Sequence, residues 1–297
     1  MRRAAPTVAL LALAGALAAC GGSEPEDRSR SERLVDLQKK PPYVNSLDID
    51  PRTREFLLTT NRGFFRIDPE TDGVRRVRGT ISAGPDESSI GTFLELKFEG
   101  PDRLVGSGHP DETTLPQFLG VIRSDDGGST WRSVSRLGDA DLHKIVLRHE
   151  RLYAWDAVLS ALIVSDDGGR SFTEHFTPRG LIIDFEVDPD DPKRIVAAND
   201  DQLFRSEDEG EGWRPILPGQ GIRLAWPAPD RLYRADKDGT LSVSPDGGDS
   251  WEEIARMDGE PYKFKALSAE ELYLALSDGT ILHTEDGGKS WEEAFRP

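Results

Sequence analysis

Short runs of alternating hydrophobic and polar residues fill the chain after residue 41, and turn-forming residues separate them. In the segment 182–216, four such runs alternate with turns rich in Asp, Asn and Gly: IIDFEVDPDDPKRIVAANDDQLFRSEDEGEGWRPI. Alternation with a period of two is typical of β-strands with one buried face. Segments 142–176 and 262–295 repeat the same order, and no stretch after residue 40 has the pattern of an amphipathic helix. The chain is therefore predicted to be all-β.

An eight-residue turn recurs along the chain. It reads SDDGGSTW in its first copy, and the five copies begin at Ser124, Ser165, Ser206, Ser244 and Thr284. Successive copies are 38 to 41 residues apart. A period near 40 residues is the length of one four-stranded blade of a β-propeller.

Two further units complete the repeat. Residues 44–77 have the same strand order without the turn, and residues 93–135 carry its first copy and an inserted loop from Gly106 to Gly120. The six units predict a six-bladed β-propeller over residues 42–297. Seven blades, the alternative, would need another blade within residues 78–92, and that stretch is too short.

Each copy of the turn places a hydroxyl first, Asp two residues later, Gly four later and an aromatic residue seven later. The Asp should accept hydrogen bonds from amides of its own turn, the Gly should permit the turn, and the aromatic ring should pack between blades. A calcium loop is the alternative, but the spacing lacks the oxygen ladder and terminal Glu of an EF-hand. The third copy has Gly212 where a second hydroxyl is usual. The predicted structural residues are Ser124, Asp126, Gly128 and Trp131; Ser165, Asp167, Gly169 and Phe172; Ser206, Asp208, Gly210 and Trp213; Ser244, Asp246, Gly248 and Trp251; and Thr284, Asp286, Gly288 and Trp291.

This spacing resembles the Asp-box, or BNR repeat, of sialidases, sortilin-type receptors and photosystem assembly factors. The resemblance implies that the boxes lie on hairpins away from a ligand-binding face. The region also resembles bacterial BNR-repeat lipoproteins labelled glycosylhydrolase, in the motifs at residues 106–111 and 139–143. It departs from them at residues 44–46, which read VNS where those lipoproteins have a histidine-rich entry.

The N-terminal residues have the pattern of an export signal. Residues 1–19 have two arginines followed by a short apolar run, and LAAC at residues 17–20 resembles a lipobox. We expect Cys20, the only cysteine, to be lipidated, and residues 20–41 to form a flexible tether. The protein is then exported and held by lipid at the outer face of a bacterial membrane. A plain secretory signal is the alternative.

Charge excludes one class of partner. The chain of 297 residues has 54 acidic and 37 basic residues, a formal net charge of −17. Nucleic-acid binding requires clustered Lys and Arg, so we expect no nucleic-acid partner. We further expect a monomer without a cofactor, and an envelope protein or a glycan as its ligand.

The candidate ligand-binding residues come from the two lipoprotein motifs. His109 and Asp111 lie in the inserted loop beside Ser107, and Asp141 and His143 stand where the innermost strand of a blade begins. Inner-strand ends line the mouth of a propeller, so these side chains could form a polar or metal-binding cluster. Unrelated surface histidines are the alternative, and we assign no metal and no catalytic residue.

A sialidase would need three arginines, a Tyr–Glu nucleophile pair and an acid/base carboxyl. The sequence FRID at residues 65–68 partly matches a sialidase arginine motif but continues into an ordinary hairpin turn. No Tyr, Glu and Arg set emerges from the spacing. We therefore predict a binding, assembly or scaffold protein, with exo-sialidase-like or other glycoside hydrolase activity as the alternative.

Overall fold

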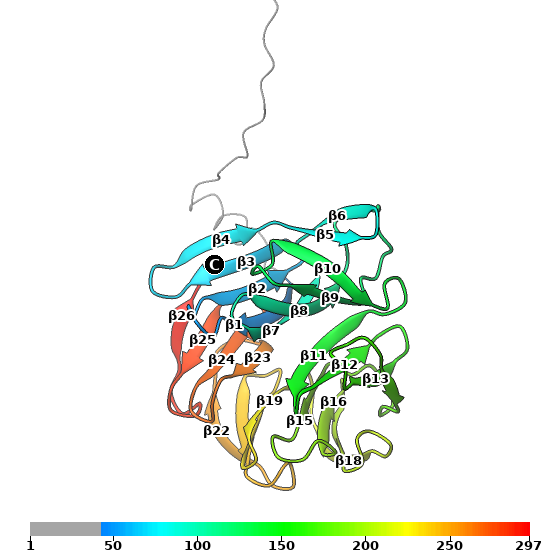
Figure 1. Cartoon of the computed structure of the whole chain (residues 1–297). Coiled ribbons are helices and arrows are strands. Elements are labelled where there is room, and N and C mark those ends of the chain that lie inside the picture. The colour runs from blue at the N-terminus through cyan, green and yellow to red at the C-terminus, as the bar shows by residue number, and fades with distance from the viewer. Residues whose placement is uncertain (1–42) are drawn as a thin grey trace, which may run out of the picture.

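The structure, a computed structural model, describes residues 43–297 and contains strands and turns. Its strands form six sheets that stand around a central axis like blades (Figure 1). The prediction of an all-β, six-bladed propeller is confirmed. Among the described residues no helix is long and apolar enough to cross a membrane. The predicted signal segment, Cys20 and tether lie outside the described residues.

Each blade is built from consecutive strands, and the first strand of each main four-stranded unit lies nearest the axis (Figure 1). Blade 1 contains β1 (Val44–Ile49), β2 (Phe56–Thr60), β3 (Gly63–Asp68) and β4 (Gly73–Val77). Blade 2 contains β5 (Gly79–Ala83), β6 (Asp86–Ile90), β7 (Leu94–Gly100), β8 (Arg103–Gly108), β9 (Val121–Ser124) and β10 (Thr130–Ser135). Blade 3 contains β11 (Leu142–Arg148), β12 (Arg151–Asp156), β13 (Ala161–Ser165) and β14 (Thr173–His175). Blade 4 contains β15 (Asp184–Val187), β16 (Ile195–Ala198), β17 (Gln202–Ser206) and β18 (Arg214–Pro218). Blade 5 contains β19 (Arg223–Ala228), β20 (Arg231–Ala235), β21 (Thr240–Ser244) and β22 (Glu252–Arg256), and blade 6 contains β23 (Pro261–Ala266), β24 (Leu272–Leu276), β25 (Ile281–Thr284) and β26 (Glu292–Phe295).

The stretch that is too short for a seventh blade widens blade 2 instead. Its two strands form a hairpin, and β5 pairs in parallel with β10 at the outer edge of the sheet. Thr80 and Ile81 lie opposite Thr130 and Trp131 in this register. Blade 2 therefore has six strands where the other blades have four.

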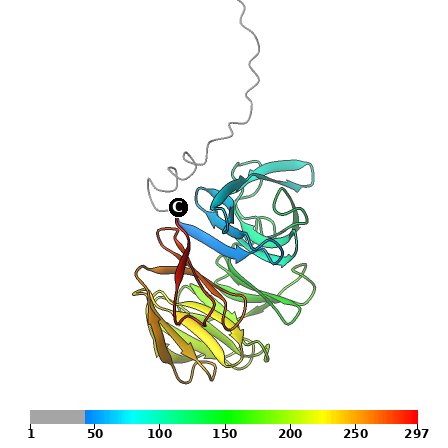
Figure 2. The ribbon, with the colours of Figure 1, turned by 90° about the vertical axis from the view of Figure 1, so that its left-hand side faces the viewer.

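The ring closes by packing between its first and last blades, which lie side by side (Figure 2). One core cluster joins residues from both, and the rings of Phe56 and Tyr273 meet edge to face at 5.6 Å. Lys265 of β23 also pairs with Asp48 of β1 at 2.6 Å. Because each sheet is made of consecutive strands, no strand is shared between the two ends of the chain.

The antiparallel order gives the ring two distinct faces. The innermost strand of each blade begins on one of them, which we call the mouth face, and the hairpin between the second and third main strands also lies there. The Asp-box turns join the third and fourth main strands, so they lie on the opposite face, which we call the Asp-box face.

In the first copy of the turn, the carboxylate of Asp126 organises the backbone. It accepts hydrogen bonds from the amides of Ser129 and Thr130 at 3.0 and 2.8 Å and from the Thr130 hydroxyl at 2.7 Å. Gly128 has a φ of 98°, a conformation that disfavours any side chain. Trp131 donates Nε1–H to the Gly128 carbonyl at 2.9 Å. In the third copy Gly212 lacks the hydroxyl but keeps the backbone bond, 2.8 Å from its amide to Asp208 Oδ1.

Candidate binding site at the mouth of the ring

A cavity of about 490 Å³ opens on the mouth face, where the innermost strands begin. Inner strands and loops of all six blades contribute to its wall, so residues far apart in the sequence meet there. Three kinds of side chain line it: a histidine–aspartate cluster, an aromatic rim and a charged floor. The lining includes Tyr43, Asn45, Phe93, Glu95, His109, Asp141, His143, Leu181, Arg223, Tyr262 and Lys263.

Asp141 lies between the two predicted histidines. Its Oδ2 atom is 2.9 Å from Nε2 of His143, and its Oδ1 atom is 3.6 Å from Nε2 of His109. Nδ1 of His109 is 3.0 Å from the carbonyl oxygen of Gln117. A carbonyl can only accept, so Nδ1 carries a proton. The structure therefore brings together three of the five candidate ligand-binding residues.

The environment of His143 favours its charged form. The hydrogen bond to Asp141 raises the pKa of His143, and burial opposes that rise without cancelling it. Glu95 also raises this pKa, whereas Lys263 lowers it. The imidazole is thus a group whose charge changes with pH at the wall of the cavity.

The inserted loop holds His109 in position. The predicted loop covers residues 106–120, and its first three residues form the end of β8. The remainder leads to the outer hairpin of blade 2, formed by β5 and β6. Leu115 and Leu119 are buried and anchor the loop to the core. At its outer end the amide of Asp111 donates to the Ser89 carbonyl of β6 at 2.9 Å. The loop thus covers the edge of the extra hairpin and presents a histidine to the cavity.

Two candidate residues lie outside the cavity. Asp111 accepts hydrogen bonds from the amide and hydroxyl of Thr92 at 3.2 and 2.6 Å and is not part of the cavity lining. Ser107 is fully buried, and its hydroxyl accepts a 3.1 Å bond from the Leu142 amide, which joins blades 2 and 3. Within residues 43–297 no group of three or more His, Cys, Asp or Glu side chains is arranged to hold a metal.

The rim of the cavity is apolar and exposed. Phe93 is 46% exposed. Its φ is 52°, and it is the only hydrophobic residue among the described non-glycine residues with a positive φ. Such a backbone is unfavourable for a bulky side chain, so strain of this kind is a pointer to function. The rings of Tyr43 and Tyr262 meet edge to face at 5.1 Å on another side of the rim.

Most exposed hydrophobic residues of the described chain lie on the mouth face. The described chain has six large hydrophobic side chains that are exposed. Five belong to segments that open an innermost strand, lead into one, or form a hairpin on the mouth face. Phe176 instead follows the outermost strand β14, and its carbonyl accepts a 2.9 Å hydrogen bond from Trp213 of an Asp-box. The six are Tyr43, Phe93, Val158, Leu159, Phe176 and Leu181.

The floor of the cavity is charged. Arg223 donates Nε–H to the Tyr262 carbonyl at 2.6 Å and lies 5.1 Å from the centre of that ring, and no described carboxylate pairs with it. Nζ of Lys263 is 3.6 Å from Glu95, which also pairs with Lys97 at 3.0 Å. Burial lowers the pKa of Lys263, Glu95 opposes this, and Arg223 and Lys97 add to it. The floor therefore has a surplus of positive charge that a ligand could neutralise.

Sequence reasoning missed most of this wall, although the inner strands hold a usable signal. Charged residues recur at every second position of several of them, as in Glu95 and Lys97 of β7 or Lys263 and Lys265 of β23. A charged residue facing inward in a short buried strand is costly unless that strand lines a water-filled channel. The missed residues are Tyr43, Asn45, Phe93, Glu95, Leu181, Arg223, Tyr262 and Lys263.

Arg66, in the FRID stretch, lies outside the mouth. It is 6% exposed, pairs with Asp50, and its Nε atom is 2.8 Å from Glu55. Its guanidinium also lies 5.9 Å from the centre of the Phe98 ring. The lining of the mouth cavity has one arginine where a sialidase would need three.

The chain has the fold of a β-propeller with BNR-type structural neighbours, and no family model matches it. A 122-residue stretch, 41% of this chain, is 29% identical to the dispase autolysis-inducing protein of Streptomyces mobaraensis, of which it spans 30%. Three solved structures share the fold. YCF48 from Cyanidioschyzon merolae matches with 13% identity over 85% of each chain and a TM-score of 0.52. YCF48 bound to D1 peptide matches with 14% identity over 83% of this chain and 94% of that chain, with a TM-score of 0.55. The GH74 xyloglucanase of Xanthomonas campestris matches with 16% identity over 85% of this chain and 38% of that chain, with a TM-score of 0.54.

Proposed function

We propose that this protein is a binding and assembly protein whose mouth face takes up an extended segment of a partner protein. The observation that carries the proposal is the position of the exposed hydrophobic residues. Five of the six in the described chain lie on the mouth face. Exposed apolar residues that gather on one face typically mark an interaction site.

The cavity suits such a segment. Its aromatic rim can contact apolar side chains, and Tyr and Trp are frequent anchors at protein interfaces. Arg223, Lys263 and His143 can meet an acidic side chain or a carboxylate, while Asp141 and Glu95 can meet donors. One of the structural neighbours is a propeller of the same type bound to a peptide, which makes a peptide ligand a reasonable first hypothesis here.

The proposed location is the outer face of a bacterial membrane, with a lipid on Cys20. The chain enters the described domain at Tyr43, on the rim of the cavity. A tether attached at this point would direct the mouth face toward the surface that carries the anchor. Partners with segments close to that membrane would then be the ones within reach.

Glycoside hydrolysis is the second candidate, since Glu95 and Asp141 line one cavity. A glycosidase needs one carboxyl that keeps its proton and one that attacks or activates water. Here Asp141 lies between two histidines and Glu95 between two lysines. Both carboxyl groups are thus engaged by basic side chains of the protein rather than free to face a substrate. Turnover of fluorogenic sialosides or neutral glycosides that Glu95→Gln abolishes would reverse this choice.

A peptide library tests the proposal. Phage-displayed peptides selected on the folded protein should bind the wild type and lose at least about tenfold in affinity with Phe93→Ala, because buried aromatic anchors typically contribute 2 kcal/mol or more. Arg170→Ala, an exposed change on the Asp-box face, is the matched control and should leave affinity unchanged. Selected peptides whose affinity is unchanged by Phe93→Ala but reduced by Arg170→Ala would contradict the proposal.

A further inference from the structure

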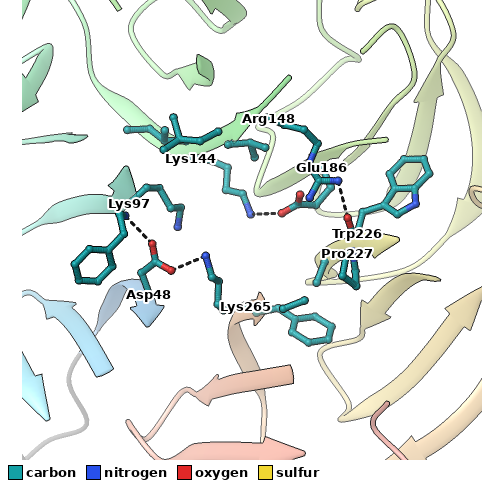
Figure 3. Close-up of a pocket in the computed structure, with 15 residues that line it drawn as sticks. Asp48, Lys97, Lys144, Arg148, Glu186, Trp226, Pro227 and Lys265 are labelled. Carbon is teal, nitrogen blue, oxygen red and sulfur yellow. Dashed lines mark hydrogen bonds and ion pairs between the residues drawn. The ribbon is translucent and has the colours of Figure 1, made fainter. Parts of the chain in front are cut away.

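A second cavity, of about 150 Å³, is drawn in Figure 3. Its lining includes Arg148 and Ala266, the last residues of two innermost strands, so it lies at the Asp-box end of the central channel. It is separate from the mouth cavity and shares no lining residue with it. Its charged lining comes from the innermost strands of five blades. These residues are Asp48, Lys97, Lys144, Arg148, Glu186 and Lys265.

Positive charge exceeds negative charge in this cavity. Four cations face two carboxylates, a formal charge of +2 inside a chain whose net charge is −17. The layer above adds Arg223 and Lys263 as cations and Glu95 and Asp184 as carboxylates, so the surplus persists along the channel. Each lysine of the channel has a carboxylate partner, so the surplus comes from Arg148 and Arg223, which have none among residues 43–297. A bound anion would offset this surplus.

Three ammonium groups, those of Lys97, Lys144 and Lys265, point toward the centre of the channel from different blades (Figure 3). Their side chains are 17, 12 and 27% exposed, so they are largely enclosed but reachable by solvent. Each Lys carries three N–H donors, nine in all. Four described carboxylates lie within ion-pair distance of these three ammonium groups, and each can accept one of the nine bonds. Five donors therefore remain for water or a ligand.

The carboxylates hold these lysines in place without saturating them. Lys144 pairs with Asp184 at 2.5 Å and Glu186 at 3.2 Å. Burial alone would lower the pKa of Lys144, but these two carboxylates raise it, so its ammonium is charged at neutral pH. Arg148 donates to the carbonyls of Val187 and Trp226 at 2.9 and 2.6 Å and has no carboxylate partner among residues 43–297.

We infer that this end of the channel binds a small divalent oxyanion of the phosphate or sulfate kind, either free or as the terminal group of a larger molecule. Lys97, Lys144 and Lys265 would donate to its oxygens, and Arg148 would add charge from the rim. The volume is about ten times the 10–15 Å³ that one water needs, which leaves room for such an ion and a few waters. The divalent charge equals the surplus of the lining.

Isothermal titration calorimetry of the folded protein with inorganic phosphate, at ionic strength held constant with sodium chloride, tests the site. The wild type should show saturable binding of one ion. Lys97→Gln should weaken it at least about tenfold, since charge-assisted hydrogen bonds are the strong ones. Lys97→Arg should retain most of it. A second titration with glycerol phosphate separates the two sources, because tighter binding of the ester indicates a phosphorylated molecule.

Lys237→Gln is the matched control, because that side chain is 61% exposed and lies outside the channel. The inference fails if the wild type gives no saturable heat, or if both glutamine variants weaken binding equally. Should Lys97→Gln not fold, wild-type crystals soaked in selenate decide the question. An anomalous peak between the three lysines supports the site, and peaks elsewhere only, or none, overturn it.

Discussion

Replacing Trp131 with Ala should destabilise the fold more than any other change at an Asp-box aromatic position. Trp131 is 3% exposed and packs in a core cluster of blades 1 and 2. It lies opposite Ile81 in the parallel pairing that attaches the extra hairpin, and its indole donates to Gly128. The equivalent Trp291 is only partly buried, so the same change there removes less contact.

Truncating a buried Trp to Ala typically costs about 3–5 kcal/mol. For a domain of this size each kcal/mol shifts the melting temperature by about 2–4 °C, so a fall of roughly 6–20 °C follows. Calorimetry and urea unfolding measure it, with Trp291→Ala as the matched variant and expected to cost less. Peptide affinity at the mouth should be unchanged below the melting temperature. A cost below about 1 kcal/mol, or lost binding with unchanged stability, would refute the assignment of the box as structural.

Three further predictions concern charge and anchoring. The pKa of His143 is raised above 6.5, so the contribution of His143 to the free energy of unfolding is complete below pH 6.5 and is lost as the pH rises through the raised pKa. In His143→Gln, the free energy of unfolding measured in urea should therefore change less with pH above 6.5. Hydrogen bonds from Ser250 lower the pKa of Asp246 to about 2, so the stabilising contribution of Asp246 is present above pH 3.8 and is lost on acidification toward pH 2. The pKa values of the other Asp-box aspartates are lowered in the same way, so Asp246→Asn should make the fall of stability below pH 3.8 less steep without abolishing it. An unchanged slope would contradict the reasoning. Cys20→Ala should release the protein from the membrane fraction or block its processing, and full retention would count against lipidation.

The fold could be predicted because the repeat length is set by local chemistry. Four short strands and their turns need about 40 residues, and the Asp-box marks the same point in each unit. The extra hairpin could not be predicted, because the parallel pairing of Thr80 with Thr130 joins residues far apart in the sequence. Nothing in residues 78–92 alone indicates which sheet edge they join.

The candidate site was predictable only in part. His109 and His143 belong to adjacent blades, and both lie at the mouth end of the strands beside them, so ring geometry alone brings them to Asp141. Tyr43 and Tyr262 meet through ring closure between the first and last blades, which one sequence without its structure does not fix. Exposure of Phe93 is likewise a tertiary property, since a hydrophobic residue before a strand is usually buried.

Site-specific photo-crosslinking in the producing cell tests the central claim, that the mouth face binds a partner protein. p-Benzoylphenylalanine would replace Phe93 on the rim of the mouth or Arg170 on the Asp-box face, in otherwise identical full-length chains. We predict a discrete protein adduct from position 93 and none from position 170. An adduct from position 170 alone, equal adducts from both, or none from position 93 would contradict the account.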